Sequence, residues 1–198
     1  MGLTRLTLAE PHDGDRELDE VTLARAQIGD RAAQAVLIER YQRPVFALLS
    51  RMLGGQRALV EDLAQETFLR VLRSLHGFDR RGPARLSTWI LTIATRLALD
   101  DLRRRTPRPE DAVVAGSTPA VLPRPDQDAN RRALALALVR AVESLGTPFR
   151  AAFLLREVHG LTYEQIARAL DIDPGTVKSR LARARAVLQR ALAEVHGE

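Results

Sequence analysis

The sequence predicts an all-α protein, built as two small helical domains joined by a flexible, proline-rich linker. Apolar residues recur at helical spacing over most of the 198 residues, and no segment shows the alternation of apolar and polar residues that a half-buried strand requires. The helical pattern stops between residues 106 and 130, where five prolines are spread among small residues. We therefore expect an acidic, loose tail at 1–20, domains at 21–105 and 131–192, and a linker at 106–130.

Charge is distributed unevenly along the chain. The net charge of +5 divides into −4 over residues 1–20, +7 over 21–105, −2 over 106–130 and +4 over 131–198. Two basic blocks separated by an acidic connector favour a polyanionic partner. The absence of cysteine excludes disulfides and thiolate metal sites, and the longest apolar run, Ala133–Val139, is too short to span a bilayer. With no hydrophobic signal core at the amino terminus, we expect a soluble, cytoplasmic protein without a cofactor.

Four helices are expected in the first domain. They are expected at about Leu18–Ile28, from Asp30 to Gly54, at about Ala58–Leu75 and at about Leu86–Arg104. Pro44 lies inside the second pattern and should kink that helix. A basic loop from Phe78 to Ala84 separates the last two helices.

The second domain should contain four more helices. Two are expected at Asn130–Leu145 and Pro148–Val158, the latter with Thr147 as its N-cap. Thr162 and Gln165 then form a capping box for a short helix, and Asp173 followed by Pro174 can begin the last one. Two short helices with a tight turn between them are a helix-turn-helix, whose second helix enters the DNA major groove.

The second helix of this motif has one apolar face and one polar face. At 100° per residue, the apolar stripe consists of Val177, Leu181, Ala184 and Leu188. The opposite face carries Ser179, Ala182 and Arg183, and the flanks carry Lys178, Arg180 and Arg185. Residues facing the groove can read bases while flanking cations reach phosphates, so the arrangement favours DNA binding over a merely solvated basic face.

Three runs of sequence together resemble one bacterial family. They are EDLAQETFLRVLR at 61–73, LSTWILTIATRLALDDLRRR at 86–105 and GTVKSRLARAR at 175–185. In this order, with an acidic linker between the second and the third, they are similar to sigma factors of the sigma-70 family, in particular the extracytoplasmic-function (ECF) group. The resemblance covers roughly residues 21–105 and 131–192. It implies two helical domains, corresponding to sigma regions 2 and 4, and no catalytic activity.

The resemblance implies three sets of binding residues. Binding to the clamp helices of the largest subunit of core RNA polymerase is implied for Asp62, Gln65, Glu66, Phe68 and Leu69. Recognition and opening of the −10 promoter element is implied for Arg80, Arg81, Arg85, Ser87, Thr88, Trp89, Thr92, Arg96, Asp100, Arg103 and Arg104. Binding of the −35 element as duplex is implied for Thr176, Lys178, Ser179, Arg180, Ala182, Arg183 and Arg185. The polymerase flap and an anti-sigma factor, often membrane-bound in this family, are further implied partners.

Two aromatic side chains have alternative interpretations. Phe68 is either an apolar anchor for polymerase or a core residue. Trp89 is either a stacking surface for a base or a core residue, because it lies near the stripe of Leu86, Ile93 and Leu97. Opening of DNA requires that an unstacked base be held, and the sequence does not identify the residue that holds it.

The sequence disfavours two other functional classes. A stand-alone helix-turn-helix regulator would bind its operator without polymerase and as a symmetric dimer. The second basic, DNA-like segment and the lack of a ligand-pocket signature disfavour this alternative. An enzyme is disfavoured because the four histidines are scattered and the chain contains no zinc-protease, P-loop or nucleophile-elbow motif.

Overall fold

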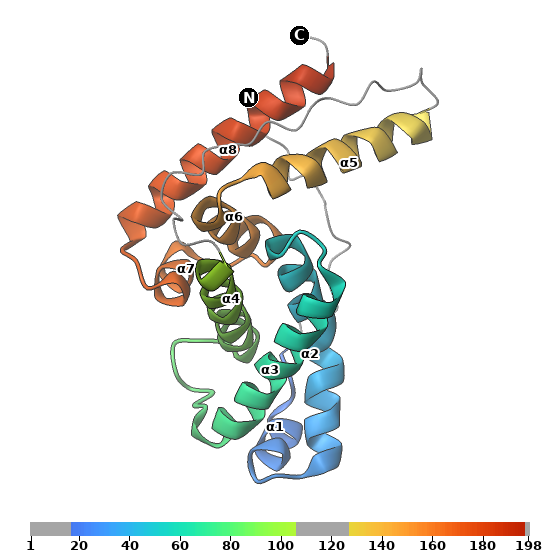
Figure 1. The fold of residues 1–198 in the computed structure, drawn as a ribbon. Helices are drawn as coiled ribbons and strands as arrows, with labels where there is room; N and C mark the ends of the chain where they lie inside the picture. The colour runs from blue at the N-terminus through green and yellow to red at the C-terminus, as the bar shows by residue number, and fades with distance from the viewer. Residues whose placement is uncertain (1–16, 106–126, 197–198) are drawn as a thin grey trace.

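The computed structural model describes residues 17–105 and 127–196, and every regular element within these ranges is helical (Figure 1). The prediction of an all-α fold is confirmed. The expected tail at 1–20 and linker at 106–130 lie almost entirely outside the described residues. Among the helices described, none combines the length and the apolar character needed to cross a membrane.

The first unit contains four α-helices. They are α1 (Glu20–Gln27), α2 (Arg31–Met52), α3 (Arg57–Ser74) and α4 (Leu86–Arg105), with a 3₁₀ turn η2 (Leu75–Gly77) after α3. The side chain of Asp30 caps α2 as predicted, by accepting hydrogen bonds from the backbone N–H groups of Ala32 and Ala33. Pro44 lies inside α2, which continues through it as one element.

Helix α2 is the centre of this unit, since it packs against α1, α3 and α4. Leu37, Val45 and Leu48 on α2 are fully buried, and Tyr41 lies among them. The Tyr41 hydroxyl accepts a hydrogen bond from the backbone N–H of Leu18 at 3.2 Å, which ties the start of the described chain to the core. Burial, reinforced by the nearby Glu17 carboxylate, raises the pKa of Tyr41 to about 12, so the hydroxyl stays protonated in this position.

The second unit also contains four α-helices. They are α5 (Gln127–Ser144), α6 (Thr147–Phe153), α7 (Tyr163–Leu170) and α8 (Pro174–His196), with a π-helical turn η3 (Leu154–Val158) after α6. The expected N-cap at Thr147 is wrong, because Gly146 occupies that position and Thr147 already begins the helix. Helix α5 packs along α8, and α6 and α7 also contact α8.

The helix-turn-helix of α7 and α8 forms as predicted. Thr162 and Gln165 make both hydrogen bonds of the capping box at the start of α7. Helix α7 ends at Asp171, whose φ of 54° is left-handed and turns the chain sharply. The Asp173 carboxylate then accepts a hydrogen bond from the backbone N–H of Thr176 at 2.8 Å, together with one from the Thr176 hydroxyl, at the start of α8.

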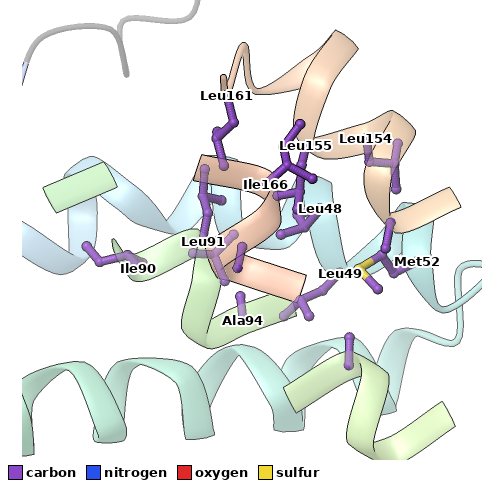
Figure 2. Close-up of a cluster of buried hydrophobic side chains, with 14 of the residues drawn as sticks. Leu48, Leu49, Met52, Ile90, Leu91, Ala94, Leu154, Leu155, Leu161 and Ile166 are labelled. Atoms are coloured by element: carbon purple, nitrogen blue, oxygen red, sulfur yellow. The ribbon is translucent and has the colours of Figure 1, made fainter. Parts of the chain in front are cut away.

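The two units pack directly against each other. Helix α4 contacts α7 and α6, and α2 contacts α5 and α6 (Figure 1). Figure 2 shows buried side chains of α2 and α4, among them Leu49 and Leu91, in one cluster with Leu154, Leu155 and Ile166 of the second unit. The two domains predicted from sequence therefore share an apolar core, which the sequence pattern did not indicate.

Candidate nucleic-acid interface

Helix α8 presents an exposed basic face. The predicted apolar stripe of Val177, Leu181, Ala184 and Leu188 is buried against the rest of the unit. Lys178, Ser179, Ala182 and Arg183 are exposed. We refer to these four residues as the α8 face. Burial in the structure thus divides α8 as the angular spacing of its sequence predicted.

The side chains on the flanks of α8 are less exposed than those of the α8 face. Thr176, Arg180 and Arg185 are half-buried. Arg185 donates a hydrogen bond to the Glu157 carboxylate at 2.7 Å, which raises the pKa of the guanidinium and ties α8 to η3. Partial burial lowers the pKa of Arg180. Arg183 makes no ion pair with another described residue, so its guanidinium is available to a ligand.

Asp173 makes the start of α8 sensitive to acid. Hydrogen bonds from the Thr176 hydroxyl and backbone N–H lower the pKa of the Asp173 carboxyl below its ordinary value of 3.8. A carboxyl whose pKa is lowered by folding stabilises the fold above its unfolded pKa, and this stabilisation is lost as the pH falls through the folded pKa. We expect wild type to melt at a higher temperature than Asp173→Ala near neutral pH.

The difference in melting temperature between wild type and Asp173→Ala should shrink below about pH 3.8, because the Asp173 carboxylate becomes protonated in the folded protein as well. Thermal melts monitored by circular dichroism over a pH series would measure it. Asp173→Asn is the matched control, because its amide oxygen can still cap the helix but does not titrate in this range. A difference between wild type and Asp173→Ala that is independent of pH would contradict the assigned role of the charge.

The outer side of α3 is an acidic and apolar surface, which we call the α3 face. It consists of Asp62, Gln65, Glu66 and Leu69. Leu69 is 40% exposed although it is a large aliphatic residue, whereas Phe68 is 7% exposed and belongs to the core. Glu66 pairs with Arg70 one turn later at 2.7 Å, which fixes its carboxylate on the surface. Of the two large apolar residues among the expected polymerase contacts, Phe68 and Leu69, the structure exposes Leu69.

A cavity of about 950 Å³ lies between the end of α3, the following loop and α4. We call it the α4 cavity. Its aromatic lining consists of Phe78 and Trp89, whose ring centroids are 5.1 Å apart with the planes tilted by 38°. Arg70, Arg73 and Arg96 line it as well, so apolar ring surface and positive charge occur in the same depression. Trp89 is half-buried, which makes it both a packing residue and a wall of this cavity.

Sequence reasoning did not place Arg70, Arg73 or His76 at this site. Arg70 and Arg73 lie at the end of α3, which packs against α4, and His76 lies in η2. Arg70 and Arg73 are three residues apart, which places them on neighbouring positions of one helix side. The sequence therefore predicts that the two arginines lie side by side. It does not predict that the loop after η2 forms the other wall of the cavity.

The polar residues of α4 have intramolecular partners in this conformation. Thr88 is only 7% exposed, and the Thr92 hydroxyl donates to the Thr88 carbonyl at 2.8 Å. The Ser87 hydroxyl donates to the Glu17 carboxylate at 2.7 Å. Arg96 donates to the backbone carbonyls of Arg168 and Ala169 on α7, at 2.8 and 3.1 Å.

The remaining predicted −10 residues lie on the surface. Arg81, Arg85 and Arg104 are exposed. Arg80 lies 3.6 Å from the Glu20 carboxylate, and Arg103 pairs with Asp100. These exposed pairs are screened by solvent and cost little to exchange for phosphate contacts. In the part of the chain that the structure describes, no group of three or more His, Asp or Glu side chains could hold a metal ion.

Comparison with protein families gives two matches along the chain. The family described as Sigma-70 region 2 matches residues 37–108, and the family described as Sigma-70, region 4 matches residues 135–188. The first match contains the α3 face, the α4 cavity and α4, and the second contains the α8 face.

Similar curated proteins cover both units. The chain is 37% identical over 178 residues to the ECF RNA polymerase sigma factor SigE of Mycolicibacterium smegmatis, a match that covers 86% of this chain and 66% of that protein. It is 36% identical over 176 residues to the ECF RNA polymerase sigma-E factor of Salmonella typhimurium, with 84% of this chain and 90% of that protein covered.

Two solved structures have a similar fold. CnrH, solved in complex with the cytosolic domain of CnrY, matches with a TM-score of 0.62 and 23% identity over 89% of this chain and 97% of that chain. The sigma factor RpoE of Bartonella quintana, solved in complex with the anti-sigma factor NepR, matches with a TM-score of 0.58 and 23% identity over 80% of this chain and 95% of that chain. Both support the helical architecture described above.

Proposed function

The chain belongs to the ECF group of the sigma-70 family and functions as a promoter-specificity factor in transcription initiation. We propose that the α3 face binds core RNA polymerase, that α4 with its cavity opens the −10 element, and that the α8 face binds the −35 element as duplex. The observation that carries this assignment is the separation of an acidic, apolar surface on α3 from basic surfaces on α4 and α8. The protein performs no catalysis of its own in this scheme and works in the cytoplasm, where polymerase is.

Binding to polymerase is assigned to the α3 face because of its composition. An exposed leucine surrounded by carboxylates suits a partner that offers an apolar pocket within a basic rim. The clamp helices of the polymerase largest subunit are the proposed partner. The second unit is proposed to contact the polymerase flap.

Opening of the −10 element is assigned to α4 and the α4 cavity. A base taken out of the stack needs a surface for its ring, and its strand needs cations along the backbone. The pair of Phe78 and Trp89 provides ring surface, and Arg70, Arg73 and Arg96 provide charge around it. We therefore propose that the flipped base enters the α4 cavity and contacts Phe78.

This assignment predicts a defect in Phe78→Ala. Stacking of a base on an aromatic side chain contributes roughly 1–3 kcal/mol. The variant should therefore lose about 1–3 kcal/mol of the free energy that stabilises the open −10 strand. A promoter with 2-aminopurine in the −10 element reports opening by polymerase carrying the variant. Phe46→Ala, which removes a 38% exposed phenylalanine away from the cavity, is the control. Polymerase affinity of both variants is measured first, and equal opening by both would remove Phe78 from the base site.

Duplex binding is assigned to the α8 face, where Arg183 is the residue best placed to reach a base edge. We expect Arg183→Ala to lose about 1–3 kcal/mol of discrimination between the preferred −35 sequence and one altered at a single base pair. Competition binding to the two duplexes would measure the difference. Arg190→Ala removes the same charge near the far end of α8 and should weaken both duplexes equally. Equal losses on both duplexes for Arg183→Ala would make Arg183 a phosphate contact.

An anti-sigma factor is the remaining proposed partner. Both solved structures of similar fold are complexes, and one of the partners is described as an anti-sigma factor. By analogy we propose that this chain is held inactive by such a protein until a signal releases it. No small-molecule substrate is proposed.

A further inference from the structure

The loop between η2 and α4, residues 78–85, carries much of the surface proposed above for promoter opening, and we call it the −10 loop. It contains Phe78, proposed to contact the flipped base, and the expected −10 residues Arg80, Arg81 and Arg85. Its residues that line the α4 cavity are Phe78, Asp79, Gly82, Pro83 and Ala84. Residues 78–85 form neither helix nor strand, so the shape of the loop depends on the contacts within it and at its two ends.

Only the middle of the −10 loop is shaped by local contacts. The Arg81 N–H donates to the Asp79 carboxylate at 2.8 Å, and the Gly82 N–H donates to the Asp79 carbonyl at 3.1 Å. These hydrogen bonds close a tight turn at 79–82. A Cβ at Gly82 would lie 2.9 Å from the Asp79 carbonyl oxygen, so the turn requires glycine there. The turn does not determine how the loop is placed relative to α4.

Gln27, the last residue of α1, holds the start of the −10 loop. Its half-buried side-chain amide donates to the carbonyl of Phe78 at 2.8 Å and to the carbonyl of Leu75 at 3.0 Å. A primary amide has two N–H donors, which matches the two carbonyls. The Phe78 ring lies beside Trp89, with 5.1 Å between the ring centroids. Gln27 therefore fixes the backbone from which the Phe78 ring reaches the cavity.

Glu17 holds the other end of the −10 loop. Its carboxylate accepts hydrogen bonds from the backbone N–H groups of Leu86 at 3.1 Å and Ser87 at 3.4 Å, and from the Ser87 hydroxyl at 2.7 Å. These residues begin α4, where N–H groups have no intrahelical acceptor. Arg85 precedes them, and an arginine side chain has no acceptor with which to cap a helix. Glu17 supplies the missing cap, and its charge suits the positive end of the helix dipole.

The chain that carries Glu17 and Gln27 is itself fixed by the core. Leu18 is buried, and its N–H donates to the Tyr41 hydroxyl of α2 at 3.2 Å. Leu23 and Ala26 of α1 are also buried. Helix α1 packs against α2 and against η2 (Figure 1). Both ends of the −10 loop are therefore attached, through α1 and the residues before it, to the centre of the first unit.

The contacts between this chain and the −10 loop occur in reverse order along the two segments. Glu17 contacts the start of α4, Glu20 lies 3.6 Å from Arg80, and Gln27 bonds the carbonyl of Phe78. The two segments thus run antiparallel along the whole loop. The pair of Glu20 and Arg80 is exposed and screened by solvent. We therefore expect Glu17 and Gln27 to contribute most to holding the loop.

We propose that Glu17 and Gln27 are positioning residues for promoter opening, and we call this pair the α1 brace. The brace fixes both ends of the −10 loop before DNA binds, so that the entropy cost of ordering the loop does not oppose capture of the −10 strand. It acts through the loop and the first turn of α4, without contacting the flipped base. The proposal rests on the proposed role of the loop and the α4 cavity in promoter opening.

Proteolysis of the free, full-length protein tests whether the brace holds the loop. Trypsin cleaves after arginine, and the −10 loop contains three arginines. Gln27→Leu removes the amide donors, and Glu17→Ala removes the cap of α4. Each variant should be cleaved within residues 78–85 about tenfold faster than wild type, as expected when hydrogen bonds that hold the loop are lost and the cleavable form is more populated. Mass spectrometry identifies the cleaved bond, and circular dichroism confirms that each variant is folded.

Gln34→Leu is the matched control for the proteolysis. Gln34 is also half-buried and also donates to a backbone carbonyl, but its acceptor is Ala26 of α1, at 3.2 Å. That carbonyl keeps a second donor, the Gly29 N–H at 3.1 Å. Gln34→Leu should therefore be cleaved at the wild-type rate. If Gln27→Leu and Glu17→Ala are cleaved no faster than this control, the brace does not hold the loop and the proposal is wrong.

Promoter opening is then measured with core polymerase and a promoter that carries 2-aminopurine in the −10 element. Gln27→Leu and Glu17→Ala should each lower the equilibrium constant for opening by about tenfold, while polymerase affinity and −35 duplex binding stay at the wild-type values. Glu17→Gln should recover most of the opening, because its amide oxygen can still accept a hydrogen bond from α4. A general loss of stability would lower all three measurements. Faster cleavage of the loop with unchanged opening would refute the positioning role.

Variants of the loop itself separate the brace from the proposed function. Phe78→Ala and Arg81→Ala leave Glu17 and Gln27 in place. If polymerase carrying either of these loop variants opens the −10 element as well as wild type does, the loop is not the opening surface, and the proposed function fails whatever the proteolysis shows. If the loop variants are defective and the brace variants are not, the proposed function stands and the brace alone is wrong.

Discussion

Leu181→Ala is expected to destabilise the second unit by about 2–5 kcal/mol and to abolish binding of −35 duplex near the resulting melting temperature. Leu181 is fully buried on α8, in the stripe that packs α8 against the rest of the unit. Truncation removes apolar contacts and leaves a cavity that the surrounding helices cannot fully close. Denaturant unfolding monitored by circular dichroism measures the loss.

Leu136→Ala is the matched control for this prediction. Leu136 is 59% exposed on α5, so its truncation should change the free energy of unfolding by no more than about 0.5 kcal/mol. If Leu181→Ala unfolds at the same denaturant concentration as Leu136→Ala, the assigned packing of α8 is incorrect.

Leu69→Arg is expected to weaken binding of core polymerase by about 2 kcal/mol or more, which corresponds to roughly 30-fold. Leu69 is the exposed aliphatic side chain of the α3 face, and a cation there would be desolvated against the apolar pocket that we propose for the partner. Glu66→Arg should act in the same direction, because it reverses one of the carboxylates and also breaks the pair with Arg70. Fluorescence anisotropy with labelled protein and core polymerase provides the affinities.

Duplex binding provides the control for both changes. Val21→Arg introduces the same residue type at a 70% exposed aliphatic position on α1, outside every surface assigned to polymerase, and it should leave polymerase affinity near wild type. All three variants should retain binding of −35 duplex through the α8 face. An unchanged polymerase affinity for Leu69→Arg and Glu66→Arg would remove the α3 face from the polymerase interface.

Local features of the fold could be predicted because a few neighbouring residues determine them. The capping box of Thr162 and Gln165, the cap at Asp30 and the buried stripe of α8 each depend on spacing within one or two helical turns. The N-cap before α6 differs by one residue from the prediction, because threonine and glycine have similar capping preferences and the sequence does not decide between neighbouring positions. The preceding Gly146 has the extended backbone that the position needs, and no side chain caps it there.

The packing between the two units could not be predicted in this way. A hydrophobic pattern indicates that Leu49 and Leu155 are buried, but it does not indicate which helix covers them. Arg96 looks like a DNA-binding cation in the sequence, yet its acceptors are backbone carbonyls 72 and 73 residues away. Backbone carbonyls carry no sequence signature, so contacts of this kind emerge only from the three-dimensional structure.

The exposure of the candidate residues was predicted more completely for α8 than for α4. The exposure of Lys178, Ser179 and Arg183 follows from the helical period alone. The α4 cavity requires η2 and the following loop to bring Phe78 against Trp89, and loop geometry of this kind is not determined by periodicity. The sequence left open whether Trp89 is a core residue or a stacking surface for a base. In the structure one part of its ring packs against the core and another part lines the α4 cavity.

Reconstituted run-off transcription tests most directly whether this chain confers promoter specificity on polymerase. Purified core RNA polymerase is assayed with and without the protein on its own upstream DNA, and binding of the same DNA without polymerase is measured in parallel. We expect transcripts from one discrete start only when both proteins are present, together with weak binding by the protein alone. Tight, symmetric binding in the absence of polymerase, with no transcript gained, would contradict this function and indicate a conventional helix-turn-helix regulator.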